Sequence, residues 1–423
     1  MFARRIAVVG TGYVGLTTGA CLASLGHRVV CADSDAAKVA RLQAGRVTIP
    51  EPGLPELVTA GLAAGRLEFV LGATQAVGNA EVVFLCVPTP MGEGGAADLR
   101  AVESVIAEVG ARLPRGCILV NKSTVPVGTA AKIAELLDRD DVAVVSNPEF
   151  LREGSAVEDF LDPDRIVVGS DAEDAAERVV ALYTRLGAPS VLTDAASSEL
   201  VKYAANCFLA MKLSYVNAMA ELCERLGADI ADVTEGMGYD RRIGQSFLRP
   251  GPGWGGSCLP KDTYALAQVA RVAGVEFPLL EATIDTNTRQ RQLVLGKIRA
   301  AAGGSLRGKR IGMLGLAFKA GTDDLRDSPA LAVAELLAAE GAELSAYDPA
   351  ISGEVPGILT TDDPYQAVKG AAVIVLLTEW PEFRGLDWGR IGEMAQAPVV
   401  DTRNHLDPDV VRLAGLAWIG IGR

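Results

Sequence analysis

Histidine is scarce in this sequence, and its cysteines form no CxxC pair. The chain has two histidines and seven cysteines, and an odd number of scattered cysteines argues against both a disulfide framework and a zinc site. We therefore expect no metal. A histidine base would have to be His27 or His405, and we expect His27, between a helical segment and a strand, to be a surface turn residue.

Basic residues are fewer than acidic residues in this sequence, and long apolar runs are missing. Lysine and arginine number 40 against 53 acidic residues, and a net charge of -13 repels nucleic acid and anionic membranes. No apolar run approaches the roughly 18 residues of a membrane-spanning helix, and Arg4-Arg5 leads into a short strand rather than a signal peptide. We expect a cytoplasmic protein without nucleic-acid or membrane partners, in which local groups bind any phosphate.

The first half of the chain alternates between strand-like and helical segments. IAVVG (6–10), a helical segment (11–26) and HRVVCADSD (27–35) form one βαβ unit. This alternation predicts a mostly parallel, doubly wound sheet. Further strands are expected at 81–87, 117–124, 142–148 and 165–169, with helices at 98–112 and 128–138.

The middle of the chain, from Ser197 to about Arg299, is nearly continuous helix. Long helices with apolar residues on several faces bury against one another or against a second copy, so we expect a homodimer. After AAGGS (301–305) the α/β pattern returns, with a glycine and an aspartate at points comparable to the first half. Strands are expected at 309–318, 342–349, 371–378 and 397–404, with a helix at 328–341.

The first helix opens with GxGxxG at residues 10–15, directly after a strand. The first glycine permits a tight turn, the second lets a pyrophosphate approach the backbone, and the third lets helix and strand pack closely. Asp33, at the end of the second strand, is placed to accept hydrogen bonds from ribose hydroxyls and to repel a 2′-phosphate. The motif therefore predicts a dinucleotide site that favours NAD over NADP.

Cys258 differs from the other six cysteines, which lie in apolar strands or helices. It follows WGGS, a stretch with few side chains that we expect to admit a ligand, and it precedes Pro260, a residue favoured at the start of a helix. A helix N-terminus with Lys261 close by favours the thiolate. Cys258 is therefore a candidate nucleophile.

Lys202 and Asn206 are four residues apart on a predicted helix and share one face. An amine and an amide presented together can hold an oxyanion, although alone they would be an ordinary polar face. Asp262, four residues after Cys258, is placed to support a water or the lysine.

Short motifs recur along the chain: GTGYVG (10–15), VPTP (87–90), KSTVPVG (122–128), NPEFLREG (147–154), KYAAN (202–206), RIG (242–244), GWGGSCLPKD (253–262), GLAFKAGTDDLRDSP (315–329), YDP (347–349) and DTRN (401–404). In their order, and over essentially the whole chain, they resemble the motifs of the UDP-glucose/GDP-mannose 6-dehydrogenase family. Ser257 stands where relatives that act on UDP-N-acetylmannosamine tend to show histidine, so the resemblance is greatest to the UDP-glucose branch.

The resemblance implies an α/β protein with two Rossmann-like, doubly wound lobes joined by a helical central dimerisation region. Residues 1–196 would form the NAD-binding domain. Residues 197–300 would form the helical domain with the cysteine loop and the dimer interface, and residues 301–423 the UDP-binding domain.

The resemblance also implies the reaction, a four-electron oxidation of the sugar C6 alcohol of UDP-glucose to the carboxylate of UDP-glucuronate, a precursor for polysaccharide synthesis. Two NAD are used in succession, with a thiohemiacetal and then a thioester on Cys258. Lys202 and Asn206 would stabilise the oxyanion, Asp262 would assist the water, and Thr124, Glu149 and Glu153 would handle water and proton transfer. The sequence is also compatible with a solvated loop at Glu149 and Glu153.

Three sets of residues carry these implied roles. The catalytic residues would be Cys258, Lys202, Asn206, Asp262, Thr124, Glu149 and Glu153. NAD would be held by Gly10, Gly12, Tyr13, Val14, Gly15, Asp33, Lys38, Thr89, Pro90, Thr124, Glu153 and Arg326. The nucleotide sugar would be held by Glu149, Phe150, Leu151, Arg152, Glu153, Lys202, Asn206, Arg249, Pro250, Gly251, Pro252, Gly253, Trp254, Gly255, Phe318, Lys319 and Arg403, with Arg242 reaching the substrate of a neighbouring subunit.

Other functions are compatible with the sequence. The nearest is the same chemistry on GDP-mannose or another nucleotide sugar. A two-electron hydroxyacid dehydrogenase shares the plan of a Rossmann lobe plus helices but needs no cysteine, and a nucleotide sensor needs no chemistry. The number of NADH formed per sugar separates these functions.

Overall fold

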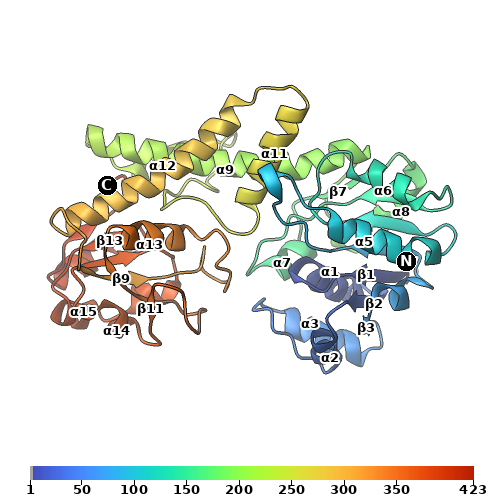
Figure 1. Ribbon diagram of the computed structural model, residues 1–423, viewed down its shortest axis with the longest axis horizontal. Helices are drawn as coiled ribbons and strands as arrows, with labels where there is room; N and C mark the ends of the chain where they lie inside the picture. The colour runs from blue at the N-terminus through green and yellow to red at the C-terminus, as the bar shows by residue number, and fades with distance from the viewer. Residues whose placement is uncertain (1–2) are drawn as a thin grey trace. The chain divides into compact units, whose positions relative to one another are not determined.

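The computed structural model describes residues 3–423 and contains two α/β sheets with a helical central region (Figure 1). The chain divides into a first unit, Met1–Ala205 with Tyr264–Ala273, and a second unit, Asn206–Thr263 with Gly274–Arg423. Helices α9 (Ala195–Leu226) and α11 (Leu259–Val272) each contribute to both units.

The first sheet has eight strands, and neighbouring strands pair in parallel except β6 and β7, which are antiparallel. This confirms the predicted, mostly parallel sheet. Across the sheet the strands are β3 (Leu67–Leu71), β2 (Arg28–Asp33), β1 (Arg5–Val9), β4 (Val82–Leu85), β5 (Ile118–Asn121), β6 (Ala143–Ser146), β7 (Ile166–Gly169) and β8 (Ser190–Thr193).

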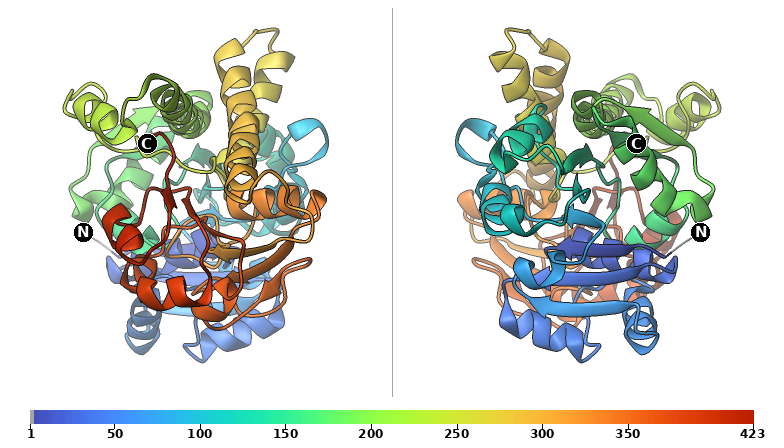
Figure 2. Two further views of the ribbon diagram at one scale, coloured as in Figure 1. Left: turned by 90° about the vertical axis from the view of Figure 1, so that its left-hand side faces the viewer. Right: turned by 90° about the vertical axis from the view of Figure 1, so that its right-hand side faces the viewer.

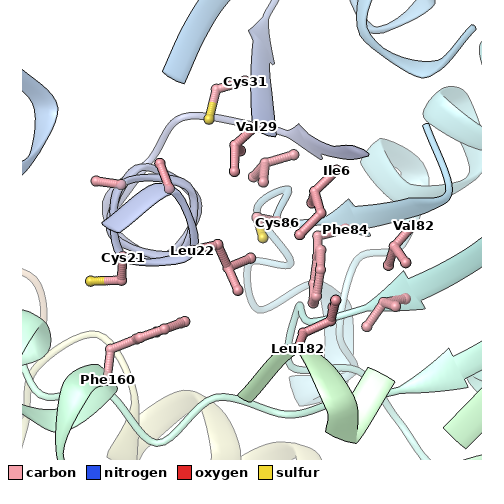
Figure 3. Packing of buried hydrophobic residues seen from close by; sticks show 14 of the residues in the cluster. Ile6, Cys21, Leu22, Val29, Cys31, Val82, Phe84, Cys86, Phe160 and Leu182 are labelled. Atoms are coloured by element: carbon pink, nitrogen blue, oxygen red, sulfur yellow. The ribbon is translucent and has the colours of Figure 1, made fainter. Parts of the chain in front are cut away.

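The apolar runs of the central strands exist because both faces of this sheet are covered. In β1, Ile6 and Val8 join one buried cluster and Ala7 and Val9 join another, as the alternation of side chains in a strand requires. Figure 3 shows the first cluster, where Ile6 lies with other strand residues beside Leu22.

Helices of the first unit fall into two layers, one on each face of the sheet (Figure 2). One layer contains α1 (Tyr13–Ser24), α2 (Ala36–Gln43), α3 (Leu54–Ala63), α7 (Ala156–Leu161), α8 (Glu173–Val180) and the 3₁₀ helix η3 (Ala181–Leu186). The other contains α4 (Ala73–Val77), α5 (Arg100–Val109) and α6 (Thr129–Leu137).

The second sheet is parallel throughout its described pairs. Its strands are, across the sheet, β11 (Leu359–Thr360), β10 (Glu343–Tyr347), β9 (Arg310–Leu314), β12 (Val373–Leu376), β13 (Val399–Asp401) and β14 (Trp418–Ile419). One face packs on α9, α10 (Ile230–Gly238), α12 (Pro278–Ala301) and α13 (Pro329–Ala339). The other packs on α14 (Pro364–Val368), α15 (Trp388–Met394) and α16 (Pro408–Leu413).

Both sheets begin with the same turn after their first strand. Gly10 has φ +95° and donates its N–H to Ala32 O at 2.8 Å, while Gly315 has φ +97° and donates to Tyr347 O at 2.8 Å. A positive φ is available to glycine at little cost, which explains the residue at both points.

An aspartate completes each turn. Asp33 Oδ2 accepts the Thr11 N–H at 2.9 Å, and Asp348 Oδ2 accepts the Leu316 N–H at 2.7 Å. The predicted repeat of glycine and aspartate is therefore present at the level of individual hydrogen bonds. The strand predicted at 309–318 is shorter than expected. It ends at Leu314 because the chain turns at Gly315.

His27 is buried, which corrects its expected place on the surface. Its Nδ1 accepts the Arg4 N–H at 3.3 Å, and its Nε2 lies 3.2 Å from Leu182 O. Burial lowers the pKa of this imidazole. Its hydrogen bonds tie the start of β2 to η3, so His27 is part of the core.

Among the described residues, no helix combines the length and the apolar character needed to cross a membrane.

Candidate active site

The glycine turn after β1 leaves room for a ligand at one of its three glycines. A Cβ on Gly15 would lie 1.9 Å from Gly10 O, and a Cβ on Gly10 would lie 2.5 Å from Cys86 O. A Cβ on Gly12 would meet no atom within 4 Å. The space over Gly12, at the N-terminus of α1, fits the pyrophosphate of NAD. Tyr13 and Val14 begin that helix.

Asp33 is held at the carboxyl end of β2 by several donors. Its carboxylate accepts bonds from the Thr11 hydroxyl at 2.6 Å, from the Asp35 N–H at 3.0 Å and from Lys38 Nζ at 3.0 Å. Burial alone would raise the pKa of Asp33, but these hydrogen bonds outweigh it and lower the pKa to about 2. The carboxylate stays ionised at neutral pH, which agrees with the expected preference for NAD.

Thr89, Pro90 and Thr124 follow β4 and β5, the strands next in order to β1. The Thr89 hydroxyl donates to Thr124 O at 2.7 Å, so the two loops are tied together. The strand order reverses between β1 and β4, and ligands of doubly wound sheets bind beyond the carboxyl ends of strands at such a point. The structure therefore brings these predicted NAD residues to one end of the sheet.

Glu51 is a buried carboxylate at this end of the sheet that the sequence analysis did not identify. It accepts bonds from the Tyr13 hydroxyl, from the Gly154 N–H at 2.8 Å and from the Val157 N–H at 3.3 Å, the last at the start of α7. Glu51 thus joins the glycine turn to the loop that carries Glu149 and its neighbours.

Lys202 and Glu149 form a buried ion pair. Lys202 Nζ donates to Glu149 Oε1 at 2.9 Å and to Glu149 O at 2.7 Å, and the Leu151 N–H donates to Oε2 at 2.7 Å. Burial would raise the pKa of Glu149, but Lys202, the Leu151 N–H and the charge of Lys122 outweigh it, and the pKa is lowered. The solvated-loop interpretation of Glu149 is therefore wrong.

Phe150, the next residue along, carries two cations over its ring. The Arg165 guanidinium lies 3.5 Å and Lys202 Nζ 5.5 Å from the ring centroid. Arg152 is exposed and pairs with Asp159 of α7. Glu153 is only partly buried.

Cys258 is the partly exposed cysteine of the second unit, whereas Cys21, Cys31, Cys86, Cys117, Cys207 and Cys223 are buried as predicted. It immediately precedes α11, and Cys258 O accepts the Asp262 N–H at 3.0 Å, the first-turn bond of that helix. The Ser257 hydroxyl lies 3.6 Å from its sulfur. The predicted position at a helix N-terminus is confirmed.

Asp262 is fully buried one turn after Cys258, between two donors. Asn206 Nδ2 donates to Oδ2 at 2.6 Å, and Lys261 Nζ donates to Oδ1 at 2.6 Å. Asp262 therefore pairs with Lys261, and its expected support of a water or of Lys202 stays a prediction. Because Asn206 donates to Asp262, the orientation of its amide is fixed.

The glycine-rich segment before Cys258 is buried against the protein itself. A Cβ on Gly253 would lie 2.7 Å from Asn287 Oδ1, and one on Gly255 would lie 2.0 Å from Asp327 O. Asn287 also binds both backbone groups of Trp254, at 2.8 and 2.9 Å. Protein atoms occupy the Cβ positions of these two glycines, so packing accounts for the residue type there, and the expected contact of this backbone with a ligand stays a prediction.

Arg403 reaches this segment from the end of β13. Its Nη2 donates to Phe318 O at 3.0 Å, its Nε lies 3.1 Å from Glu379 Oε2, and its guanidinium lies 3.3 Å from the Cβ position of Gly251. Lys319 Nζ lies 5.8 Å from the ring centroid of Phe318. The second unit therefore assembles predicted nucleotide-sugar residues from three separate segments.

Three predicted arginines are exposed in the second unit. Arg242 pairs with Asp240 at 2.6 Å, and Arg326 pairs with Asp324 at 2.6 Å. Arg249 precedes the buried segment of Pro250 and Pro252. The assignments of Arg326 to NAD and of Arg242 to a neighbouring subunit stay predictions, as do the other site roles and the three domain boundaries.

The comparisons with known proteins agree with this arrangement. The chain matches three models of the UDP-glucose/GDP-mannose dehydrogenase family: the NAD binding domain over residues 4–187, the central domain over 196–289 and the UDP binding domain over 312–408.

Individual relatives are similar over the full length. A UDP-glucose 6-dehydrogenase of Rhizobium meliloti is 45% identical, with 99% of each chain covered. One of Pseudomonas aeruginosa is 43% identical, with 99% of this chain and 97% of the relative covered. The solved UDP-glucose dehydrogenase of Pyrobaculum islandicum superposes with a TM-score of 0.92 at 38% identity, covering 100% of this chain and 98% of the other. The chain therefore belongs to the UDP-glucose/GDP-mannose dehydrogenase family.

Proposed function

We propose that this protein is an NAD-dependent UDP-glucose 6-dehydrogenase that produces UDP-glucuronate. The observation that carries the proposal is the position of Cys258, partly exposed at the N-terminus of α11 with the Asn206–Asp262 pair one turn away. The similar proteins named UDP-glucose 6-dehydrogenase support this choice of nucleotide sugar over GDP-mannose.

The first unit would hold the cofactor. The turn at Gly12 would receive the pyrophosphate, Asp33 the adenosine ribose, and Thr89 and Thr124 the far half of the dinucleotide, with Lys38 and Glu153 beside them. NAD, when bound, supplies a hydride acceptor for each of the two oxidations.

Cys258 would turn the intermediate aldehyde into a species that can lose a second hydride. The thiolate sulfur forms a bond to the aldehyde carbon, and the former carbonyl oxygen takes a proton to give a thiohemiacetal. Loss of hydride and a proton gives the thioester. Water then adds to the thioester carbon, the carbon–sulfur bond breaks, and carboxylate and thiol are released.

The neighbouring side chains would hold charge and water in these steps. Lys202, which donates to Glu149, and Asn206, oriented by Asp262, would stabilise the oxyanion that forms when sulfur or water attacks. Asp262 would orient the attacking water, and Thr124 with Glu153 would move its proton.

The second unit would hold the nucleotide sugar. The buried segment from Pro250 to Gly255 would present backbone groups to the ligand, with Arg249, Arg403 and Lys319 near the diphosphate and Phe318 beside it. These arginines and lysines supply the local positive charge that a protein of net charge -13 needs to bind a diphosphate.

We also propose that the protein is a homodimer that acts in the cytoplasm and supplies UDP-glucuronate for polysaccharide synthesis. The support for the dimer is an exposed apolar row on α9, formed by Phe208, Tyr215 and Leu222. Residues seven apart lie on one face of a helix, and such rows pack against a partner helix.

The stoichiometry of the reaction tests the proposed function. A panel containing UDP-glucose, GDP-mannose and UDP-N-acetylmannosamine is incubated with NAD, and NADH is counted per sugar consumed. We expect two NADH per UDP-glucose and the highest kcat/KM with that substrate. One NADH per sugar would indicate a two-electron dehydrogenase, and no NADH with any sugar would contradict an enzymatic function.

A further inference from the structure

Lys122 is a buried cation of the first unit that the proposed mechanism does not use. It follows β5 and is 5% exposed, and its N–H continues the sheet by donating to Leu85 O at 3.0 Å. Its Nζ donates to Asn147 Oδ1 at 3.2 Å and lies 5.9 Å from the ring centroid of Tyr183. The side chain thus ends between the loops that follow two neighbouring strands.

Asn147 fixes the geometry around this amine. Its Oδ1 also accepts the Tyr183 hydroxyl at 2.7 Å, and its Nδ2 donates to Val167 O at 2.8 Å. The amide therefore has one orientation, with its oxygen toward Lys122. Glu149 lies two residues further on, so the loop that Lys122 binds is the loop that carries the acceptor of Lys202.

Burial of this charge is unfavourable. Among the described side chains, no carboxylate oxygen lies within 4.0 Å of Lys122 Nζ, and one direct hydrogen bond satisfies one of three N–H donors. Burial lowers the pKa of Lys122 to about 8, with Lys202 acting in the same direction and Glu149 and Cys86 against it. Burial also raises the pKa of Cys86 to about 12, so Cys86 is a neutral thiol at pH 7.

An uncharged side chain of the same size would fill this position at lower cost, because replacing buried charges by apolar groups is often neutral or stabilising. Buried ionisable groups whose pKa is shifted by specific neighbours cluster at functional sites. Lys122 also lies two residues before Thr124, at the end of the sheet where ligands bind.

We infer that Lys122 is a positioning residue of the active site, whose positive charge, held in place by Asn147, keeps Glu149 ionised as the acceptor of Lys202. Two buried ammonium groups then act on one carboxylate, which favours an additional negative charge at Lys202, such as the oxyanion of the proposed reaction. The catalytic part of this inference rests on the proposed function.

Three variants of the full-length protein test the inference. Lys122→Met removes the charge and keeps the volume, and Lys122→Arg keeps the charge. Lys132→Met is the control, because Lys132 is a half-exposed lysine on α6 that pairs with Glu103 at 2.5 Å. The parameters measured are kcat, KM for NAD and for the nucleotide sugar, and the pH profile of kcat/KM.

We expect Lys122→Met to lower kcat by about 10- to 100-fold while both KM values change by less than about threefold. Because the charge of Lys122 lowers the pKa of Glu149, its removal should move the acid limb of kcat/KM to higher pH. Lys122→Arg and Lys132→Met should keep the wild-type acid limb. Wild-type kcat in Lys122→Met, or an unmoved acid limb, would overturn the inference.

A stability measurement separates failure of this inference from failure of the proposed function. The pKa of Lys122 is about 8 in the folded protein against 10.5 for an unperturbed lysine, so the unfolded chain binds more protons between these values. The wild type should therefore gain stability relative to Lys122→Met as pH rises from 8 to 10. A Tm difference that is constant over this interval would overturn the inference whether or not any nucleotide sugar is oxidised.

Discussion

The residue on which the proposed chemistry depends most directly is Cys258. Replacing its sulfur by the hydroxyl of serine leaves the helix N-terminus intact but removes the thiol nucleophile. We expect Cys258→Ser to lower turnover by at least about 10³-fold, since serine cannot form a thioester. NAD affinity, measured by calorimetry, should stay within about twofold of wild type because the cofactor residues lie on other segments.

Cys117→Ala is a matched control for this substitution. Cys117 is buried immediately before β5, and burial raises the pKa of its thiol to about 11, so it is a small apolar core residue. The control should lose some stability and keep kcat. Full turnover of UDP-glucose by Cys258→Ser would remove the covalent mechanism.

At the residue scale, the sequence predicted groups that act by their chemical type. Cys258, Asp33 and the three glycines of the first turn were found because their spacing and flanking residues carry the signal. Glu51 and Lys122 were missed because nothing in their local sequence distinguishes a buried charge from a solvated one. Their significance depends on the partners that the fold brings to them, such as Tyr13 for Glu51.

At the element scale, the glycines of the turn between β1 and α1 differ in how much space surrounds them. A Cβ on Gly15 would lie 1.9 Å from Gly10 O, so Gly15→Ala should separate the helix from the strand and lower the free energy of unfolding by about 3 kcal/mol. Gly12 has φ -68° and open space, so Gly12→Ala should fold with wild-type stability.

Gly12→Ala should instead weaken NAD binding by at least about tenfold, because its methyl group occupies the space through which the pyrophosphate approaches. Thermal unfolding and NAD titration of both variants check this pair of expectations. Wild-type NAD affinity in Gly12→Ala would show that the cofactor binds elsewhere.

The strands that sequence reasoning missed share one property, which is that they lie at sheet edges. β3 and β8 are the edges of the first sheet, and β11 and β14 are those of the second. A central strand of a parallel sheet is apolar on both faces and is visible as a continuous run such as VVFL in β4. β8 is largely exposed, and its four residues give no comparable signal.

The glycine-rich loop before Cys258 shows the opposite difficulty. Its many glycines indicated correctly that another group packs closely against this backbone. They did not indicate which group that is. In the folded protein that group is Asn287, Asp327 or Phe318, from segments 30 to 75 positions away in the sequence.

At the scale of the whole molecule, the fold class was predictable because the same local sequence pattern recurs in the two sheets. Glycine after the first strand and aspartate after the second recur at Gly315 and Asp348, with matching hydrogen bonds. The two copies differ in the segment after the glycine. The first continues into a helix within three residues, whereas the second runs through Phe318 and Lys319 before α13 begins at Pro329. This difference fits a dinucleotide site in one unit and another ligand in the other.

The proposed dimer gives the prediction for the whole molecule. Phe208, Tyr215 and Leu222 are between 44% and 58% exposed, and their spacing of seven places them on one face of α9. An exposed apolar row of this kind marks a protein interface. We expect Phe208→Arg with Leu222→Arg to convert a dimer into a monomer, because two charges buried at an apolar interface have no partner.

Sedimentation of the double variant and of the control Leu413→Arg measures this effect. Leu413 is 88% exposed on α16, so the control adds one arginine to an apolar surface position outside α9. It should keep the wild-type oligomeric state.

If Arg242 reaches the substrate of a neighbouring subunit, the monomer should lose kcat/KM for the nucleotide sugar together with its dimer contacts, while NAD affinity is retained. Wild-type kcat/KM in a monomeric double variant would show that each active site is formed by one chain. Sedimentation of the wild-type protein as a monomer would contradict the proposed dimer.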